Sequence, residues 1–183
     1  MTLPFELSGT TLVVGATNTG KTRLTARALD AWIDDHGPTG VVVLDFAPEF
    51  VRDGALIGGR MTRFVDPVDT YYAAIDAHAP RASTDTESEA LALAAENAAA
   101  VAALLSSAPA DPHAVFVNDA TIACGHPDAD IDELIEYCNG ATCVVMNAYR
   151  GDELGDATHA VTRSESACLR RLLAWADHVV ELG

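Results

Sequence analysis

The residues best suited to chemistry lie in one short segment near the start of the chain, from Gly15 to Thr22. The segment reads Gly-Ala-Thr-Asn-Thr-Gly-Lys-Thr and matches G-x-x-x-x-G-K-[ST] at every fixed position. In this pattern the glycines let the backbone curl, so that successive amide groups point at one phosphate. The lysine contacts the β- and γ-phosphates, and the hydroxyl of the last residue binds Mg²⁺. The segment therefore predicts a nucleotide phosphate site.

The single lysine of the chain strengthens this prediction. The sequence has 11 basic residues, and Lys21 is the only lysine among them. Arginine is used everywhere else, which indicates that this position needs a slim ammonium rather than a planar guanidinium. The expected nucleotide-binding residues are the segment and the arginine after it: Gly15, Ala16, Thr17, Asn18, Thr19, Gly20, Lys21, Thr22 and Arg23.

The expected nucleotide is ATP, bound with Mg²⁺. GTP-specific proteins with this loop usually carry an N-K-x-D motif that recognises guanine. That motif requires a second lysine, and Lys21 is the sole lysine of this chain. ATP and magnesium are therefore the predicted cofactors, with Thr22 as one metal ligand.

Two aspartates are candidates for the carboxylate that holds the magnesium. Asp119 follows the apolar run 114–117 and Asn118, and it is the stronger candidate for a magnesium ligand or a catalytic carboxylate. Asp45 follows the apolar run 41–44 and is the second candidate metal ligand. The residue patterns leave open which of the two lies on the magnesium side.

Two further polar residues follow the fourth apolar run. Asn147 comes directly after it and is placed to sense the γ-phosphate, and Arg150 lies three residues further on. Together with Lys21 and Asp119 they complete the predicted catalytic set. A loop at 151–155 is expected near the same site.

Apolar runs alternate with helical patterns along the whole chain. Strands are expected at 11–14, 41–44, 114–117, 142–146 and 178–182, and helices at 21–36, 84–106, 131–138 and 164–176. Between them, 60–65 is interpreted as a short extra strand and 71–78 as a helix. Continuous apolar strands alternating with helices predict an α/β fold, a three-layer sandwich with a mostly parallel sheet of about five strands. Residues 1–183 are expected to form a single nucleotide-binding domain with the P-loop NTPase fold.

The order of these features resembles the additional-strand, RecA-like group of P-loop NTPases over the whole chain. The resemblance lies in the loop strand, the acid after the third strand, Asn147 after the fourth, and the closing segment 176–182. Within the group, the segment 44–50 is similar to HerA/FtsK-type ATPases. The resemblance implies an ATPase. The group typically has Asp-Glu where this chain has Asn118-Asp119, and this difference suits weak turnover.

A second resemblance is to compact nucleotide-dependent kinases, such as the type II thymidine kinases and the adenosylcobinamide kinases. It lies in the chain length and in the layout of 147–182, although the cysteine-rich zinc lobe of the thymidine kinases is missing. Three functions therefore stay open: an ATPase of unknown target, a small-molecule kinase, and a nucleotide sensor with little turnover.

The composition of the chain limits which binding partners and which cellular location are expected. The formal net charge of −16 repels nucleic acids and anionic membranes, so neither is indicated as a partner. An acidic, lysine-poor composition is also typical of a salt-loving organism.

No apolar run long enough to span a bilayer and no signal peptide is recognised, which predicts a cytoplasmic protein with four buried thiols. The acceptor, a protein partner and a homo-oligomer are left open.

Replacing Lys21 tests the predicted phosphate site. Lys21→Ala should abolish ATP binding measured by calorimetry, and Lys21→Arg should also impair function because the guanidinium is too broad for the loop. Unchanged affinity in Lys21→Ala would contradict the assignment of the loop.

Overall fold

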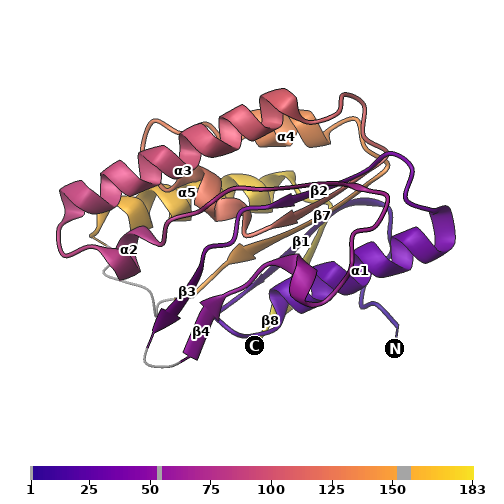
Figure 1. The fold of residues 1–183 in the computed structure, drawn as a ribbon, viewed down its shortest axis with the longest axis horizontal. Helices are drawn as coiled ribbons and strands as arrows, with labels where there is room; N and C mark the ends of the chain where they lie inside the picture. Colours follow the sequence, from indigo (N-terminus) through magenta and orange to yellow (C-terminus); the bar gives the residue numbers. More distant parts are fainter. Residues whose placement is uncertain (1, 53–54, 152–157) are drawn as a thin grey trace.

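Strands and helices alternate along the chain and form a layered α/β structure (Figure 1). The computed structural model describes residues 2–52, 55–151 and 158–183. In chain order the elements are β1 (Gly9–Gly15), α1 (Lys21–His36), β2 (Val41–Asp45), β3 (Glu49–Arg52), β4 (Ala55–Gly58), the 3₁₀ helix η1 (Met61–Arg63), β5 (Tyr71–Ala74), α2 (Pro80–Ser83), α3 (Glu87–Ser107), β6 (Ala114–Asn118), the 3₁₀ helix η2 (Ala120–Cys124), α4 (Asp132–Cys138), β7 (Cys143–Tyr149), α5 (Ala160–Trp175) and β8 (His178–Leu182).

The main sheet has six strands in the order β5-β2-β6-β7-β1-β8. Every neighbouring pair in it is parallel, so all six strands end at the same edge. β7 lies between β1 and β6 in this order. The remaining two strands, β3 and β4, form a separate antiparallel hairpin. The predicted mostly parallel sheet is confirmed, with one strand more than expected.

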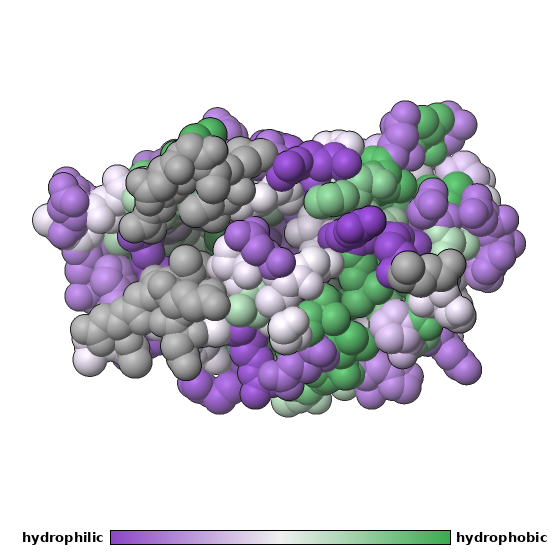
Figure 2. Space-filling view, turned by 90° about the horizontal axis from the view of Figure 1, so that it is seen from below, coloured by the Kyte–Doolittle hydropathy of each residue, from purple (hydrophilic) through white to green (hydrophobic). Residues whose placement is uncertain are grey.

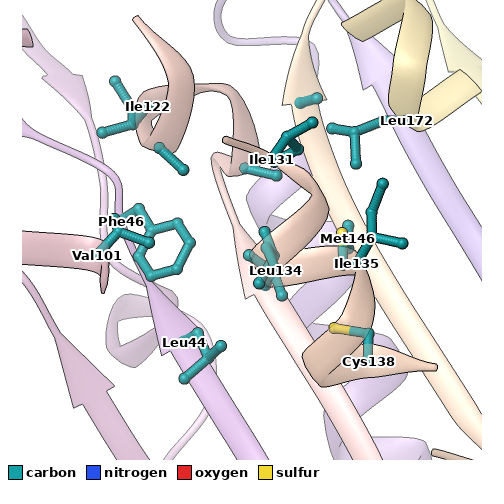
Figure 3. Close-up of a cluster of buried hydrophobic side chains, with 14 of the residues drawn as sticks. Leu44, Phe46, Val101, Ile122, Ile131, Leu134, Ile135, Cys138, Met146 and Leu172 are labelled. Carbon is teal, nitrogen blue, oxygen red and sulfur yellow. The ribbon is translucent and has the colours of Figure 1, made fainter. Parts of the chain in front are cut away.

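Helices cover both faces of the sheet, as the continuous apolar strands require. Figure 1 shows α1 on one face and α3, α4 and α5 on the other. Alternate residues of each strand belong to two cores: Val13 and Val43 pack with α1, and Leu12 and Leu44 pack on the opposite side. Figure 3 shows the second core, where side chains from strands and helices fill the space around Phe46.

The helix boundaries follow from local backbone chemistry. Gly20 has a left-handed backbone (φ 93°) directly before α1, and Gly37 (φ 80°) directly follows the helix. α1 therefore begins and ends where the sequence predicts. At the start of α3, Thr86 accepts a hydrogen bond from the Glu89 amide and donates to its carboxylate, a capping box. α3 therefore begins at Glu87, three residues after the predicted start at 84.

Two predicted elements are wrong. The segment 60–65 contains the 3₁₀ helix η1 instead of a strand, and 71–78 contains the strand β5 instead of a helix. β5 pairs with β2 along the edge of the sheet, with Tyr71 opposite Val42 and Ala74 opposite Asp45. Such a four-residue apolar run has no decisive period, so long-range pairing determines its structure. Of the predicted loop 151–155, only Gly151 lies within the described residues.

Two of the four cysteines form a disulfide, which corrects the prediction of four free thiols. Cys124 at the end of η2 is bonded to Cys168 in α5, and both are buried. Their Cα atoms lie 6.2 Å apart although 44 residues separate them in the sequence. Packing of α5 on η2 brings them together, which residue spacing alone does not reveal. Cys138 and Cys143 remain buried free thiols.

α3 is long enough and apolar enough to cross a membrane, judged by its length and composition alone. Among the described helices it alone passes a length and composition test for crossing a bilayer, with 28% of the apolar window buried. The prediction that no segment reaches this length is therefore corrected. In this fold α3 lies on the outer layer, against α4 and α5 (Figure 1). The face shown in Figure 2 is largely hydrophilic, with a run of hydrophobic residues near its middle and smaller hydrophobic patches toward its upper edge.

Removing the disulfide should destabilise the protein. Closing a loop over 44 residues is expected to contribute about 4 kcal/mol, because the cross-link restricts the unfolded chain. Dithiothreitol should therefore lower the urea midpoint of the wild type. It should leave the midpoint of the Cys124→Ala/Cys168→Ala variant unchanged. A wild-type midpoint that does not respond to dithiothreitol would show that the cross-link is not formed.

Candidate functional site

A cavity of about 610 Å³ opens at the carboxyl edge of the sheet. Its lining comes from the loop between β1 and α1, the ends of β6 and β7, the segment after β2, the hairpin β3–β4, η1, α2 and Glu165 of α5. In parallel α/β sheets ligands bind at this edge. The sequence motif and the cavity therefore coincide.

The Gly15–Thr22 segment forms the turn from β1 into α1. A side chain at Gly15 would clash, because a Cβ there would lie 2.5 Å from the Leu182 carbonyl oxygen. Lys21 Nζ donates to the Ala16 carbonyl oxygen at 2.5 Å, so the ammonium is held over the loop. Gly20 provides no side-chain acceptor for the first amides of α1, a helix start that suits an anion.

Asn118, the last residue of β6, is the centre of a buried hydrogen-bond network. Its Oδ1 accepts from Thr22 Oγ1 at 3.0 Å and from Asn147 Nδ2 at 2.9 Å. Its Nδ2 donates to Asp45 Oδ1 at 2.7 Å and to the Gly59 carbonyl oxygen at 2.9 Å. All four hydrogen bonds that the amide can make are formed. The network fixes the Thr22 hydroxyl relative to the sheet.

Asp45 lies beneath the cavity rather than in its wall. Its side chain is fully buried, and its Oδ2 accepts from the Met61 amide at 2.7 Å and from the Tyr72 hydroxyl at 3.0 Å. Burial raises the pKa of Tyr72, and the nearby Asp45 carboxylate raises it further. Both carboxylate oxygens of Asp45 therefore accept hydrogen bonds from within the protein. This arrangement suits a residue that holds Asn118 in position better than one that binds magnesium.

Asp119 is the predicted carboxylate that lines the cavity. It has a left-handed backbone (φ 61°), and its amide donates to Asn147 Oδ1 at 3.0 Å. Burial raises the pKa of its carboxyl group, and the positive charge of Lys21 partly offsets this. A carboxyl with a raised pKa is suited to accept a proton from a nucleophile.

An ion pair from distant segments forms part of the cavity wall. Arg81 Nη2 lies 2.6 Å from Glu165 Oε2, and Glu165 is 8% exposed. Burial raises the pKa of Glu165 to about 7, against the lowering effect of Arg81, while Asp119 adds to the rise. The Tyr149 ring lies near both cations: Lys21 Nζ is 5.9 Å and Arg81 Cζ is 6.0 Å from its centroid.

Of the two predicted arginines, one lines the cavity and the other does not. Arg23 is exposed and lines the cavity. Arg150 does not line it: its amide donates to the Gly15 carbonyl oxygen at 2.9 Å, and its guanidinium lies 3.5 Å from the exposed Glu181 carboxylate. Lys21, Thr22, Asp119 and Asn147 of the predicted set do line the cavity together.

The sequence prediction misses much of the cavity lining, including three charged residues and a tyrosine: Arg63, Arg81, Glu165 and Tyr149. Arg81 and Glu165 lie on α2 and α5, and no motif connects them. Tyr149 carried a weak signal, since it lies two residues after Asn147 on the same strand and therefore on the same side of it.

The charge of the cavity is opposite to that of the chain. Four of the 11 basic residues line it, against two of the 27 acidic residues. The basic residues are Lys21, Arg23, Arg63 and Arg81, and the acidic ones are Asp119 and Glu165. On a protein of net charge −16 this concentration favours an anionic ligand.

The described side chains do not form a metal site by themselves. Among them no group of three or more His, Cys, Asp or Glu residues is arranged to hold a metal ion. Magnesium commonly binds through one or two protein oxygens together with phosphate oxygens and water. Thr22 and Asp119 match such a partial donor set.

No known family model and no curated protein matches this chain. A functional assignment therefore depends on the residues of the cavity.

The two aspartates should respond differently to the same change. Asp45→Asn removes an acceptor from buried donors, so it should lower the free energy of unfolding by about 3 kcal/mol. Asp119→Asn should leave that free energy unchanged or raise it, because burial disfavours the charged carboxylate.

Activity should follow the opposite order. We expect Asp119→Asn to reduce Mg²⁺-dependent phosphate release about 100-fold, more than Asp45→Asn does. Urea denaturation and phosphate release measured on both variants check this, with the wild type as control. A stable Asp45→Asn protein with the larger loss of activity would reverse the two roles.

Proposed function

We propose that this chain binds ATP with Mg²⁺ in the cavity and hydrolyses it slowly, as a P-loop protein of the additional-strand, RecA-like group. The observation that carries the proposal is the position of the motif. The segment Gly15–Thr22 forms the turn from β1 into α1, and Lys21 and Thr22 line a cavity enriched in basic residues. A strand, a glycine-rich turn and a helix are the context that this motif requires.

The order of the strands supports the same group. In the additional-strand group a further strand separates the loop strand from the strand that carries the acidic residue. Here β7 lies between β1 and β6, and Asn118-Asp119 stands at the end of β6. Asn147 on β7 lies between the two, hydrogen-bonded to Asn118.

The bound phosphates would be held by the loop amides and by Lys21. Magnesium, held by Thr22 and by Asp119 through water, would neutralise charge on the β- and γ-phosphates. Asp119 is the one carboxylate at the end of β6, and it would also orient the attacking water. We propose slow turnover because Asp119 alone would have to hold the magnesium and orient the water, since its neighbour Asn118 carries a neutral amide.

Phosphotransfer to a small molecule is the second candidate, favoured by the extent of the cavity beyond the loop. In that reaction a hydroxyl oxygen of the acceptor bonds to the γ-phosphorus while the bond to the β-phosphate oxygen breaks. ADP leaves with the electron pair, and the hydroxyl proton passes to Asp119. A cytoplasmic location is proposed for either function.

Labelled ATP distinguishes the two candidates. With γ-labelled ATP and Mg²⁺, we expect labelled free phosphate at about 10⁻³ s⁻¹ or slower, the range of P-loop proteins without a complete catalytic set. Thr22→Val should bind ATP but lose the increase that Mg²⁺ gives, whereas Thr62→Val, an exposed position, should match the wild type. Absence of ATP binding in the wild type would refute the proposal.

A further inference from the structure

The cavity extends well past the phosphate loop. Its far part, here called the outer compartment, is walled by Pro48, Phe50, Arg63, Phe64, Pro80 and Arg81. These residues follow β2 and β5, whereas the loop follows β1. Because β6 and β7 lie between β1 and β2 in the sheet, the compartment lies beyond Asp119 as seen from Lys21. Figure 1 shows α2 and the β3–β4 hairpin at this end of the molecule.

The bound phosphate chain would point its γ end at this compartment. Thr22 and Asp119 are the residues proposed to flank the γ-phosphate, and both line the same continuous cavity as Phe50 and Arg63. The space beyond the γ-phosphate is therefore walled by protein and adjoins the proposed reacting group.

The wall of the outer compartment is tied to the buried network. The Gly59 carbonyl oxygen accepts from Asn118 Nδ2 at 2.9 Å, and Arg60 Nη2 donates to the Ile75 carbonyl oxygen at 3.1 Å. A Cβ on Gly58 would lie 1.8 Å from the Pro48 carbonyl oxygen, so the chain passes there in close contact. These contacts hold the wall in place, as ligand sites that are formed in advance require.

The lining has a defined chemistry. Phe50, Phe64, Pro48 and Pro80 supply apolar surface, and the Arg63 guanidinium lies 5.9 Å from the centroid of the Phe64 ring. In the described part of the chain Arg63 has no carboxylate within ion-pair distance, although the chain has 27 acidic residues. An arginine beside aromatic surface is suited to a carboxylate or phosphate on an apolar body.

We propose that the outer compartment binds a second small molecule beside the γ-phosphate of ATP, an anion with an apolar or aromatic body. Arg63 binds its anionic group, and Phe50 and Phe64 contact its body. This proposal rests on the proposed binding of ATP, and it supplies the ligand class that the second candidate function needs.

Phenyl phosphate is the probe that tests the compartment. It is titrated calorimetrically into protein saturated with Mg²⁺ and ADP, so that the phosphate loop is already filled. The variants are Arg63→Ser, Phe64→Ala and the matched control Arg170→Ser, which removes the same charge from an exposed position on α5 outside the cavity. ADP affinity is measured separately for each variant.

We expect saturable binding of phenyl phosphate to the wild type, weakened about 10-fold or more in Arg63→Ser and less than about 2-fold in Arg170→Ser, with ADP affinity unchanged in both. Phe64→Ala should also weaken the probe. No binding to the ADP-loaded wild type, or equal effects of the two arginine variants, would overturn the subsite.

Loss of ADP affinity in Arg63→Ser would overturn the proposal in a different way, because it would mean that the compartment holds the nucleoside of the nucleotide. Failure of the proposed function is distinguishable from both results: in that case the wild type binds neither ATP nor ADP.

Discussion

The Asn118 side chain is the constraint on which the rest of the site depends. Its amide joins the helix after the loop through Thr22, the neighbouring strands through Asn147 and Asp45, and the cavity wall through the Gly59 carbonyl group. A buried polar group that loses a partner costs about 1–3 kcal/mol, so each of these contacts resists displacement. The position of the loop relative to the sheet edge, and with it the shape of the cavity, follows from one fully hydrogen-bonded amide.

The same network explains why an asparagine, rather than an aspartate, suits position 118 at the end of β6. Asn118 Nδ2 lies 2.7 Å from Asp45 Oδ1, and Asp45 is fully buried. An aspartate at position 118 would face a second carboxylate at that distance, and two such groups do not both ionise. A donor amide is the compatible partner for Asp45. The next residue, Asp119, is the carboxylate after β6 that lines the cavity.

The sequence predicts those parts of the site that depend on local pattern and on the parallel sheet. The loop from Gly15 to Thr22 and the bounds of α1 follow from glycine chemistry and helical spacing. Thr22, Asp119 and Asn147 lie together because parallel strands end at one edge. Other features depend on packing between remote segments. Arg81 meets Glu165 across 84 positions, and Cys124 meets Cys168 only because α5 packs on η2. No local pattern contains that information. The strand structure of β5, where the sequence predicts a helix, likewise depends on its pairing with the remote strand β2.

We propose that the affinity of this protein for nucleotides resides in their phosphates. Calorimetric titration of the wild type with ATP, ADP and AMP at constant Mg²⁺ tests it most directly. If Lys21 and the loop amides hold the β- and γ-phosphates, ATP and ADP bind, and AMP binds about 100-fold more weakly or worse. AMP binding as tight as ATP would contradict the account, because the affinity would then come from the nucleoside and not from the loop.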